Sequence, residues 1–402
     1  MSILIDLTHT SHTRAQTGIQ RLCRALYAAL RDGPQPVQPV CHDPYESTWR
    51  PLRAGELRRL VPPCGPLAAA RGARWPWSLR LGGWVRKLLA ARDPARRPPP
   101  PPGDGLIEPE IFSPAVARAL PGLLARITGP RVALFHDATA LRLPELSPPK
   151  TVARYPAYLQ ELLLFDGVAA ISEDAAATLR DYWQWLGVAG PPPVLGLPLG
   201  LEAPARSPLG ATTAPVAAPV VLSVGSLEGR KNHLALLEAC ETLWGRGRRF
   251  ELRLIGLVHP QTGRAALNRL RALQAAGRPL RFDGAVSDAE LQSAYRVCQF
   301  TIYPSLMEGF GFPVLESLSH GKPCICSARG AVGEAARGGG CYTLDRVDAP
   351  SLAGAIERLL TDLEPLEVLS REARDRTFKP WPAYAAELTA WMGTLRRRGA
   401  PA

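Results

Sequence analysis

The sequence predicts an α/β protein of two doubly wound domains, each built on a parallel sheet with helices on both faces. Short and mainly apolar runs, such as "VVLSVGS", alternate with longer stretches of helical periodicity. Strands buried on both faces have this apolar character, and the helices between them form the crossovers of a parallel sheet. The length of 402 residues suits two domains of about 150–200 residues each. Such domains bind ligands in a crevice at the carboxyl ends of their strands.

The expected elements fall into two sets, one in each half of the chain. In the first half, the expected strands are 2–7, 131–137 and 167–172, and the expected helices are 19–31 and 175–186. In the second half, the expected strands are 220–226, 250–256, 280–284, 300–305 and 323–327, and the expected helices are 232–245, 288–297 and 313–320.

The domain boundaries follow from changes in composition. Residues 200–219, which are rich in alanine, proline and small polar residues, are the expected linker. The linker separates an N-terminal domain, 1–199, from a C-terminal domain, 220–375, and residues 376–402 are expected to form a helix that packs back on the first domain. Residues 45–110 end in five consecutive prolines, which fit neither a helix nor a central strand. We expect this segment to be an insertion in the first domain.

The composition favours a globular cytoplasmic protein. Hydrophobic residues make up 46% of the chain, and no run reaches the roughly 18 apolar residues of a membrane span. The start of the chain has no basic leader and carries Asp6 within its apolar run, so it predicts a buried strand and not a signal peptide. The eight cysteines include no C-x-x-C pair, which indicates reduced thiols and no zinc site.

The positive charge is concentrated in one segment. Of the net charge of +12, residues 50–97 carry +10, and the remaining 354 residues carry only +2. Trp75, Trp77 and Trp84 lie among these cations, a mixture that favours peripheral contact with an anionic membrane. A disordered insertion and a contact between subunits are the alternatives. Nucleic-acid binding is disfavoured, because no recognised nucleic-acid-binding module accompanies the basic segment.

The stretch "EGFGFPVLE", residues 308–316, predicts an anion site with a carboxylate at each end. Its glycines permit a tight turn or a close approach of ligand to backbone, and Pro313 can open a helix. The free N–H groups of such a helix start attract anions, while Glu308 and Glu316 can accept hydrogen bonds from hydroxyl groups. Phosphate between two polyol contacts describes a nucleotide sugar.

A second cluster of charge lies in "GSLEGRKN", between an expected strand and an expected helix. Arg230 and Lys231 stand just before the helix, where cations are unfavourable for the helix dipole. They are therefore candidates to neutralise a leaving diphosphate. The dinucleotide fingerprint G-x-G-x-x-G is absent from this turn.

From about residue 130 onward the chain resembles the retaining glycosyltransferases of family 4, also called group 1, which have the GT-B fold. The motifs that carry the resemblance are "LFHDATALRLPE", "DGVAAISEDAAATL", "LPLGLE", "VLSVGSLEGRKNHLALLEA", "GAVSDAELQSAY" and "YPSLMEGFGFPVLESLSHGKP", with "TGIQRLCRAL" near the start. The resemblance covers about three quarters of the chain and does not include residues 45–110. It implies a donor side in the C-terminal domain and an acceptor side in the N-terminal domain.

The resemblance also implies roles for individual residues. Glu308 would contact the donor hexose and Glu316 the ribose hydroxyls. The loop amides of Phe310, Gly311 and Phe312 would face the diphosphate. With Arg230 and Lys231, these residues would form most of the donor site.

Three further residues carry less specific roles by resemblance. His136, with Asp137 beside it, would contact the donor sugar from the first domain. Gly18 would allow a phosphate or the acceptor to approach the backbone. Val286 would flank the nucleobase.

The chain contains no Asp-x-Asp, and "EPE" at 108–110 is a poor substitute. We therefore expect no metal or other cofactor, with Arg230, Lys231 and the helix start taking the place of a divalent ion. The resemblance implies front-face attack with retention of anomeric configuration.

Together these patterns predict transfer of a hexose from a nucleotide-diphosphate sugar to a glycan or lipid-linked acceptor. Bacterial surface polysaccharide or lipopolysaccharide assembly is the expected setting, and relatives with the "TGIQR" loop suggest mannose from GDP-mannose. A sugar-nucleotide epimerase and a non-catalytic glycan-binding subunit on the same fold remain as alternatives.

Overall fold

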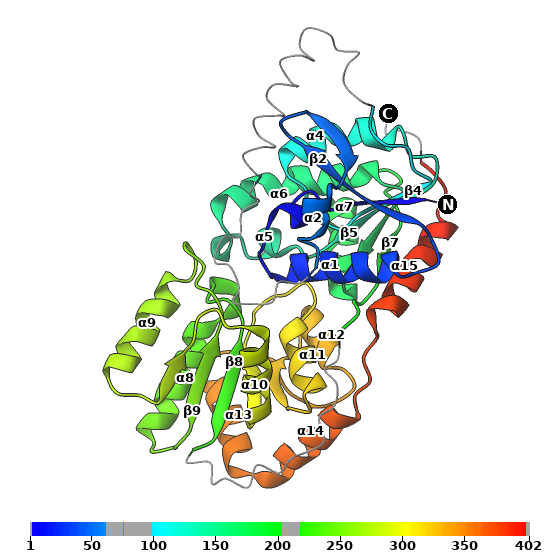
Figure 1. The fold of residues 1–402 in the computed structure, drawn as a ribbon. Helices are drawn as coiled ribbons and strands as arrows, with labels where there is room; N and C mark the ends of the chain where they lie inside the picture. The colour runs from blue at the N-terminus through cyan, green and yellow to red at the C-terminus, as the bar shows by residue number, and fades with distance from the viewer. Residues whose placement is uncertain (1, 62–74, 76–98, 203–217, 399–402) are drawn as a thin grey trace. The chain divides into compact units, whose positions relative to one another are not determined.

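The computed structural model describes residues 2–61, 75, 99–202 and 218–398 of the chain (Figure 1). The chain divides into two compact units. Unit 1 comprises residues 1–137, 154–200 and 381–402, and unit 2 comprises residues 138–153 and 201–380. The basic segment 71–97, except Trp75, and most of the expected linker lie outside the described residues.

Unit 1 contains a seven-stranded sheet with the order β3-β2-β1-β4-β5-β6-β7. Its strands are β1 (Ile3–Asp6), β2 (Val37–Asp43), β3 (Thr48–Pro51), β4 (Gly105–Glu108), β5 (Arg131–Phe135), β6 (Gly167–Ala170) and β7 (Val194–Gly196). All neighbouring strands pair in parallel except β3, which runs antiparallel to β2 at the edge. Strand β1 is buried along its whole length, as a central parallel strand should be.

The helices of unit 1 pack on this sheet, and the last of them comes from the C-terminal part of the chain. They are η1 (Thr10–His12), α1 (Gly18–Arg31), α2 (Ala54–Leu57), α4 (Pro114–Leu124), η4 (Leu162–Leu164), α7 (Glu173–Trp185) and α15 (Trp381–Thr394), while α6 (Pro149–Glu161) spans the unit boundary. Helix α15 packs beside α1. It approaches the sheet closely where the strands carry glycine, since a Cβ on Gly105 would lie 2.6 Å from Met392 and one on Gly167 2.8 Å from Trp391.

Unit 2 contains a six-stranded parallel sheet with the order β10-β9-β8-β11-β12-β13. Its strands are β8 (Val220–Val224), β9 (Glu251–Ile255), β10 (Leu280–Phe282), β11 (Phe300–Tyr303), β12 (Cys324–Ser327) and β13 (Cys341–Leu344). Its helices are α5 (Thr139–Arg142), η3 (Pro144–Leu146), η5 (Gly229–Lys231), α8 (His233–Gly245), α9 (Arg264–Ala275), α10 (Asp288–Val297), α11 (Phe312–Ser319), α12 (Gly330–Ala336), α13 (Ala349–Thr361) and α14 (Leu363–Asp375).

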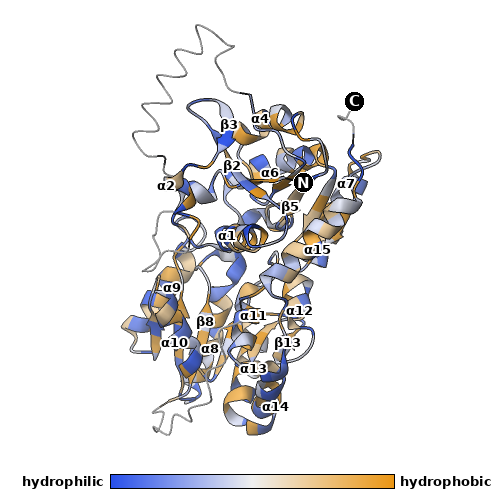
Figure 2. Cartoon of the chain, turned by 45° about the vertical axis from the view of Figure 1, so that its right-hand side comes forward, coloured by the Kyte–Doolittle hydropathy of each residue, from blue (hydrophilic) through white to orange (hydrophobic). Residues whose placement is uncertain are grey.

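The core of unit 2 occupies both faces of its sheet. Val221 of β8 packs with α8, α9 and α13 in one apolar cluster, and the next residue, Leu222, packs with α10 in another. Successive residues of a strand point to opposite faces, so the two clusters lie on opposite sides. Most helices carry blue and orange along their length in Figure 2, as amphipathic helices with one face on a sheet do.

The predicted α/β fold of two doubly wound domains is confirmed, and two details of its organisation differ from expectation. The expected insertion 45–110 is too long, because β3 and β4 are sheet strands and β4 lies beside β1 at the centre of the sheet. Residues 138–153 group with unit 2, although they precede the expected linker. No helix within the described ranges is long and apolar enough to cross a membrane.

In both sheets, the direction of strand addition reverses once near the centre. Strand β1 has β2 on one side and β4 on the other, and β8 has β9 on one side and β11 on the other. Helices after the two central strands therefore diverge, which opens a crevice at the carboxyl ends of the strands, the usual ligand position in such folds. We call these positions the β1/β4 switch point and the β8/β11 switch point.

Candidate functional site

Three predicted site residues meet at the β8/β11 switch point in unit 2. Glu308 lies between the two adjacent cations, with Oε2 2.6 Å from Arg230 Nη1 and Oε1 2.5 Å from Lys231 Nζ. Arg230 also pairs with Glu228 at 2.9 Å and donates to the Met307 carbonyl at 3.1 Å. The cluster joins the loop after β8 to the loop after β11, so residues 77 positions apart in the chain form one site.

The backbone holds these two loops together. The Arg230 carbonyl accepts a hydrogen bond from the N–H of Leu306 at 2.8 Å and from the hydroxyl of Ser305 at 3.1 Å. Asn232, which follows the two cations, adopts a left-handed conformation with φ of 56° and donates its side-chain N–H to the Val347 carbonyl at 2.7 Å. Asparagine tolerates this conformation better than most residues, and the turn ends η5 before α8 begins.

The electrostatics keep Glu308 ionised. Burial opposes its ionisation, but Arg230 and Lys231 outweigh that effect and lower the pKa of Glu308 to about 2. Burial lowers the pKa of Lys231, and the Glu308 carboxylate opposes that shift. At neutral pH, Glu308 is therefore a hydrogen-bond acceptor and a negative charge, and it has no proton to donate.

Two further buried residues of this cluster were missed by the sequence analysis. Tyr303 ends β11, its hydroxyl contacts Lys231 Nζ, and burial raises its pKa well above the usual range. His233 begins α8, and burial followed by the charge of Lys231 lowers its pKa to about 4. A polar side chain at the end of an apolar strand, as in "FTIY", was the available signal for Tyr303.

The start of α11 has the geometry expected of an anion site. Gly311 caps the helix with a φ of 107°, a left-handed conformation that favours glycine. A Cβ at this position would also lie 3.2 Å from Ala335 Cβ. The first N–H groups of a helix have no partner within it. Just before them, the ring of Phe310 packs edge-on against that of Phe312, with ring centroids 5.1 Å apart.

Glu316 lies further along α11 in a second polar cluster. Its Oε2 accepts a hydrogen bond from the Tyr295 hydroxyl at 3.2 Å, and Tyr295 stacks on His320 with ring centroids 4.6 Å apart. Val286 belongs to the apolar cluster that also contains Tyr295. Glu316 of α11, Tyr295 of α10 and Val286 in the loop before α10 thus lie near one another.

The remaining predicted residues belong to unit 1. Gly18 is the first residue of α1, after the Thr17 cap. His136 follows β5, is buried, and places Nε2 2.7 Å from the Pro109 carbonyl. Burial lowers the pKa of His136, while its bond to Pro109 opposes that shift. The neutral ring donates from Nε2 to this carbonyl, which leaves Nδ1 as the acceptor nitrogen.

The β1/β4 switch point of unit 1 carries a group of buried carboxyls that the sequence analysis overlooked. Asp6 ends β1, Glu108 ends β4, and Glu110 follows two residues later. Glu110 accepts from the N–H groups of His9 and Thr10, both at 2.7 Å. The available signal was a carboxylate at the end of an apolar run in both "ILID" and "GLIE".

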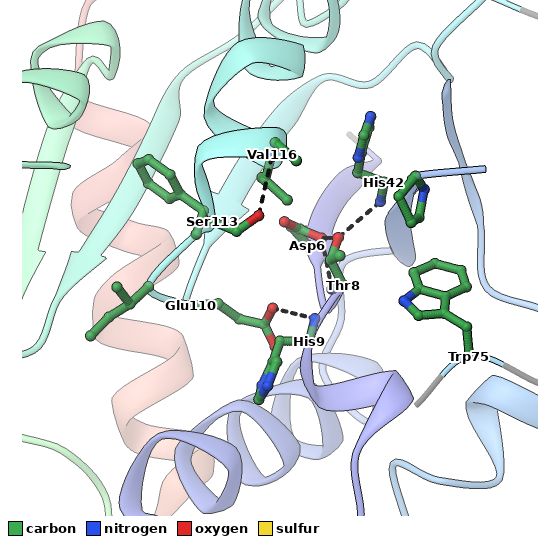
Figure 3. Close-up of a pocket in the computed structure, with 12 residues that line it drawn as sticks. Asp6, Thr8, His9, His42, Trp75, Glu110, Ser113 and Val116 are labelled. Atoms are coloured by element: carbon green, nitrogen blue, oxygen red, sulfur yellow. Dashed lines mark hydrogen bonds between the residues drawn. The ribbon is translucent and has the colours of Figure 1, made fainter. Parts of the chain in front are cut away.

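Asp6 and Glu110 border a cavity of about 200 Å³, whose described lining residues all belong to unit 1. We call it the unit 1 cavity, and its lining residues are Asp6, Thr8, His9, His42, Pro44, Trp75, Glu110, Ile111, Phe112, Ser113, Ala115 and Val116. Figure 3 shows Glu110 and Ser113 on one side, Trp75 and His42 on the other, and Asp6 and Thr8 between them. The cavity combines several polar groups with aromatic and apolar walls, as small-molecule sites commonly do.

Comparison with known families finds a match within unit 2. Residues 211–376 match the family model described as "Glycosyl transferases group 1". We call this matched range the group 1 domain. Arg230, Lys231, Glu308 and Glu316 all lie within the matched range, and the resemblance seen in the sequence is confirmed.

Two curated relatives of the group 1 domain are mannosyltransferases by name. The serotype-specific mannosyltransferase WbdA of Escherichia coli is 25% identical over 80% of this chain and 38% of its own length. The O-antigen chain mannosyltransferase B of Escherichia coli is 36% identical over 26% of this chain and 28% of its own length. The chain therefore matches little more than a third of the length of WbdA and little more than a quarter of the length of mannosyltransferase B.

Solved structures show that the GT-B fold extends beyond the group 1 domain to nearly the whole chain. The sucrose-phosphate synthase of Thermosynechococcus elongatus has a TM-score of 0.67 at 18% identity and covers 97% of this chain and 98% of its own. HepE of Anabaena, solved in complex with UDP and glucose, has a TM-score of 0.65 at 16% identity and covers 98% of this chain and 100% of its own. At these identities the likeness establishes the fold alone.

Proposed function

We propose that the protein is a retaining hexosyltransferase that moves mannose from a nucleotide-diphosphate sugar to a glycan or lipid-linked acceptor. The observation that carries the proposal is the cluster of Arg230, Lys231 and Glu308 at the β8/β11 switch point of the group 1 domain. The names of the curated relatives support mannose as the donor sugar and O-antigen-type polysaccharide assembly as the setting.

In this proposal the two cations stabilise the leaving diphosphate. Both are already held within one site, so little reorganisation is needed when negative charge develops on the leaving group. Arg230 offers several N–H donors in a fixed plane, and Lys231 offers a compact charge. The first N–H groups of α11 add donors for the phosphate oxygens. These groups supply the positive charge that a divalent ion provides in other transferases, and we propose that the reaction is independent of metal.

Glu308 and Glu316 have different tasks. Glu308 is ionised between its two cations, so it accepts hydrogen bonds from hexose hydroxyls and stabilises positive charge that develops on the sugar ring. Glu316 accepts hydrogen bonds from the ribose hydroxyls, and Tyr295 orients its carboxylate at 3.2 Å. Val286, Phe310, Gly311 and Phe312 complete the donor side. The contacts of Glu308 with the hexose change as the reaction proceeds, whereas the contacts of Glu316 with the ribose persist.

The transfer step exchanges two bonds at one carbon. The bond between the anomeric carbon and the diphosphate oxygen breaks, and an acceptor hydroxyl oxygen forms a bond to that carbon on the same face. The proton of the acceptor hydroxyl passes to the departing diphosphate, so no external base or redox partner is required. His136 and Gly18 of unit 1 contribute contacts to the donor sugar and to a phosphate or acceptor.

A panel of nucleotide sugars tests this proposal. We expect GDP-mannose to raise the melting temperature of the purified protein, and release of GDP to require an acceptor. Activity should persist in excess EDTA. Failure of every nucleotide sugar to bind, or loss of activity on chelation with recovery on adding one metal, would contradict the proposed donor site. Acceptor-independent isomerisation of the donor would indicate an epimerase.

We also propose that the basic segment, residues 71–97, brings the enzyme to an anionic membrane. The support is the net charge of +10 between residues 50 and 97, with about 1 kcal/mol expected per basic residue near such a surface. Replacing Arg80, Arg86, Lys87 and Arg92 by glutamate should abolish sedimentation with anionic vesicles and barely change turnover on a short soluble acceptor. Indifference of the unaltered protein to anionic vesicles at low salt would overturn this part.

A further inference from the structure

We propose that the unit 1 cavity binds one uncharged sugar ring of the acceptor, with hydroxyl groups hydrogen-bonded to Asp6 and Glu110 and a C–H face against Trp75. The inference rests on the proposed function, since it assigns the acceptor side of that reaction and narrows its substrate class. It places the ring at the β1/β4 switch point, where the fold opens a crevice at the ends of β1 and β4.

The carboxyls at this cavity can bond to hydroxyl groups. Asp6 is 1% exposed, lines the cavity, and uses Oδ1 to accept from the N–H of Thr8 at 2.9 Å and from the Thr8 hydroxyl at 2.5 Å. Its Oδ2 has no hydrogen-bond partner within the described part of the chain. A carboxylate oxygen has more than one lone pair, so both Asp6 and Glu110 can accept further hydrogen bonds from a ligand.

Burial favours the protonated forms of the neighbouring carboxyls Asp6 and Glu108. Burial, and then the charge of Glu110, raises the pKa of Asp6 to about 7, and burial beside Asp6 raises the pKa of Glu108 well above its usual range. Asp6 Oδ2 and Glu108 Oε2 have no hydrogen-bond partner within the described part of the chain, and protonation lowers the cost of burying them. The two bonds from Thr8 hold the Asp6 carboxyl in a fixed orientation.

Trp75 is a supported aromatic wall. Its indole stacks on the His12 ring with centroids 3.6 Å apart and planes 19° from parallel. His12 Nε2 lies 2.9 Å from Glu56, and Glu56 forms two hydrogen bonds of 2.8 Å with Arg50. A ring held this way loses little freedom when a ligand binds, which favours affinity. The flat, apolar C–H face of a sugar ring suits such a surface.

The charge of the cavity selects against anions. Among the described residues that line it, Asp6 and Glu110 carry carboxyls and none is arginine or lysine, and Glu108 lies beside Asp6. The start of α4 is beside the cavity and would by itself favour an anion, but its cap residue Ser113 already bonds to the N–H of Val116. A phosphate or a uronate would meet like charges here, so the ring that enters should be neutral.

Ligand-observed NMR titrations on the full-length protein test the inference. The probes are methyl α-mannopyranoside and methyl α-glucopyranoside, which are neutral, and mannose 6-phosphate, which is anionic. We expect at least one neutral glycoside to bind and the anion to bind about tenfold or more weakly. The variants Trp75→Ala and Asp6→Asn should each weaken the neutral probe by about tenfold, a change of about 1.4 kcal/mol.

Trp185→Ala is the matched control, because Trp185 belongs to the same unit and is 79% exposed. It should leave binding of the neutral probe unchanged. Trp75→Phe keeps an aromatic wall and should bind the neutral probe more tightly than Trp75→Ala does. It serves as the second variant if Trp75→Ala lowers stability. Each variant is compared at a temperature well below its own melting transition.

The outcomes distinguish this inference from the proposed function. Binding of GDP with no response to any glycoside, or equal glycoside binding by Trp75→Ala and Trp185→Ala, would overturn the sugar site alone. Tighter binding of mannose 6-phosphate than of the neutral probes would overturn the charge selection. Binding of Mg²⁺ or Mn²⁺ that Asp6→Asn abolishes, without glycoside binding, would make the cavity a cation site. Absence of nucleotide binding would instead contradict the donor site.

Discussion

Both units have buried carboxyls at the switch point of their sheet, but the pKa of the carboxyl is lowered in unit 2 and raised in unit 1. At the β8/β11 switch point, Glu308 has two cationic partners and remains ionised with a pKa of about 2. At the β1/β4 switch point, the charged neighbours of Asp6 among the described residues are the carboxyls of Glu108 and Glu110, and its pKa rises to about 7. Burial acts in the same direction at both sites, so the neighbouring charges decide the outcome.

The difference indicates what each site can hold. Paired cations with a helix start suit a diphosphate, whose charge is spread over several oxygens. Carboxyls whose pKa values are raised suit neutral hydroxyls, which can both donate and accept. In our proposal, the same arrangement of central strands, used twice in the chain, holds a diphosphate in unit 2 and a neutral sugar in unit 1.

The largest expected effect concerns the cations of unit 2. Lys231→Met should lower turnover by about 10²–10³-fold, the usual loss when one stabilising group is removed from a developing oxyanion. Glu308 would keep Arg230 as its partner, at 2.6 Å, so the loop should stay folded. Steady-state kinetics with GDP-mannose measure this effect.

Arg248→Met is the control for the cation substitution. Arg248 pairs with Glu357 at 2.8 Å at the surface, and exposed pairs of this kind contribute about 0–1 kcal/mol. Its turnover should match that of the unaltered protein. Full activity of Lys231→Met would contradict the proposal that the diphosphate binds at the β8/β11 switch point.

The next effect in size separates the two glutamates of unit 2. Glu316→Ala should raise the Kd for the free nucleotide by about tenfold or more, since a hydrogen bond to a charged group contributes about 1.5–3 kcal/mol. Tyr295→Phe removes only the bond that orients Glu316 and should have a smaller effect in the same direction. Isothermal titration with GDP measures both.

Glu308→Gln should leave nucleotide affinity nearly unchanged and depress turnover, because the hexose contact acts where charge develops. Glutamine is preferable to alanine here, since it retains a polar partner for the buried Lys231. Equal losses of nucleotide affinity in Glu308→Gln and Glu316→Ala would contradict the division of roles.

A smaller effect concerns stability as a function of pH, and its sign differs between the units. The folded pKa of Asp6 is raised, so the folded state binds more protons and stability falls as pH rises from about 4 to about 7, by up to about 1.4 kcal/mol per pH unit for each proton. The folded pKa of Glu308 is lowered, so its contribution is present above about 4.5 and is lost as pH falls toward 2.

Urea unfolding at several pH values measures these slopes. Asp6→Asn should flatten the decline between pH 4 and pH 7, and Glu308→Gln should flatten only the loss on the acid side. An Asp6→Asn variant with the same slope as the unaltered protein would mean that the pKa of Asp6 is not raised in the folded state.

Much of the fold was predictable because its longest elements carry local signals. The expected helices 19–31, 232–245 and 288–297 are observed as α1, α8 and α10 within one residue at each end. The strands β2, β3, β4, β7 and β13 were missed. Strand β2 contains a proline and three polar residues, and β4 follows a run of prolines, so neither carries a clear apolar pattern. Such strands depend on pairing with neighbours that the local sequence does not specify.

The candidate site was predictable where residues share a motif and not where separate strands bring them together. Glu308 and Glu316 lie in one nine-residue stretch, and Arg230 and Lys231 are adjacent. Their ion pairs depend on β8 lying beside β11, which composition and spacing do not reveal. In the same way, Asp6 and Glu108 meet only because β4 crosses back to pair with β1, and Trp75 reaches the cavity from a segment without periodicity.

Hydrogen–deuterium exchange with each ligand in turn tests the central comparison most directly. We expect GDP to protect peptides covering 225–233 and 305–316 in unit 2, and a neutral methyl glycoside to protect peptides covering 6–12 and 106–116 in unit 1. Exchange slows where a ligand binds because local opening becomes rarer. Protection of the unit 1 peptides by GDP, with none around Arg230 and Glu308, would contradict the assignment of an anion site to unit 2 and a neutral sugar site to unit 1.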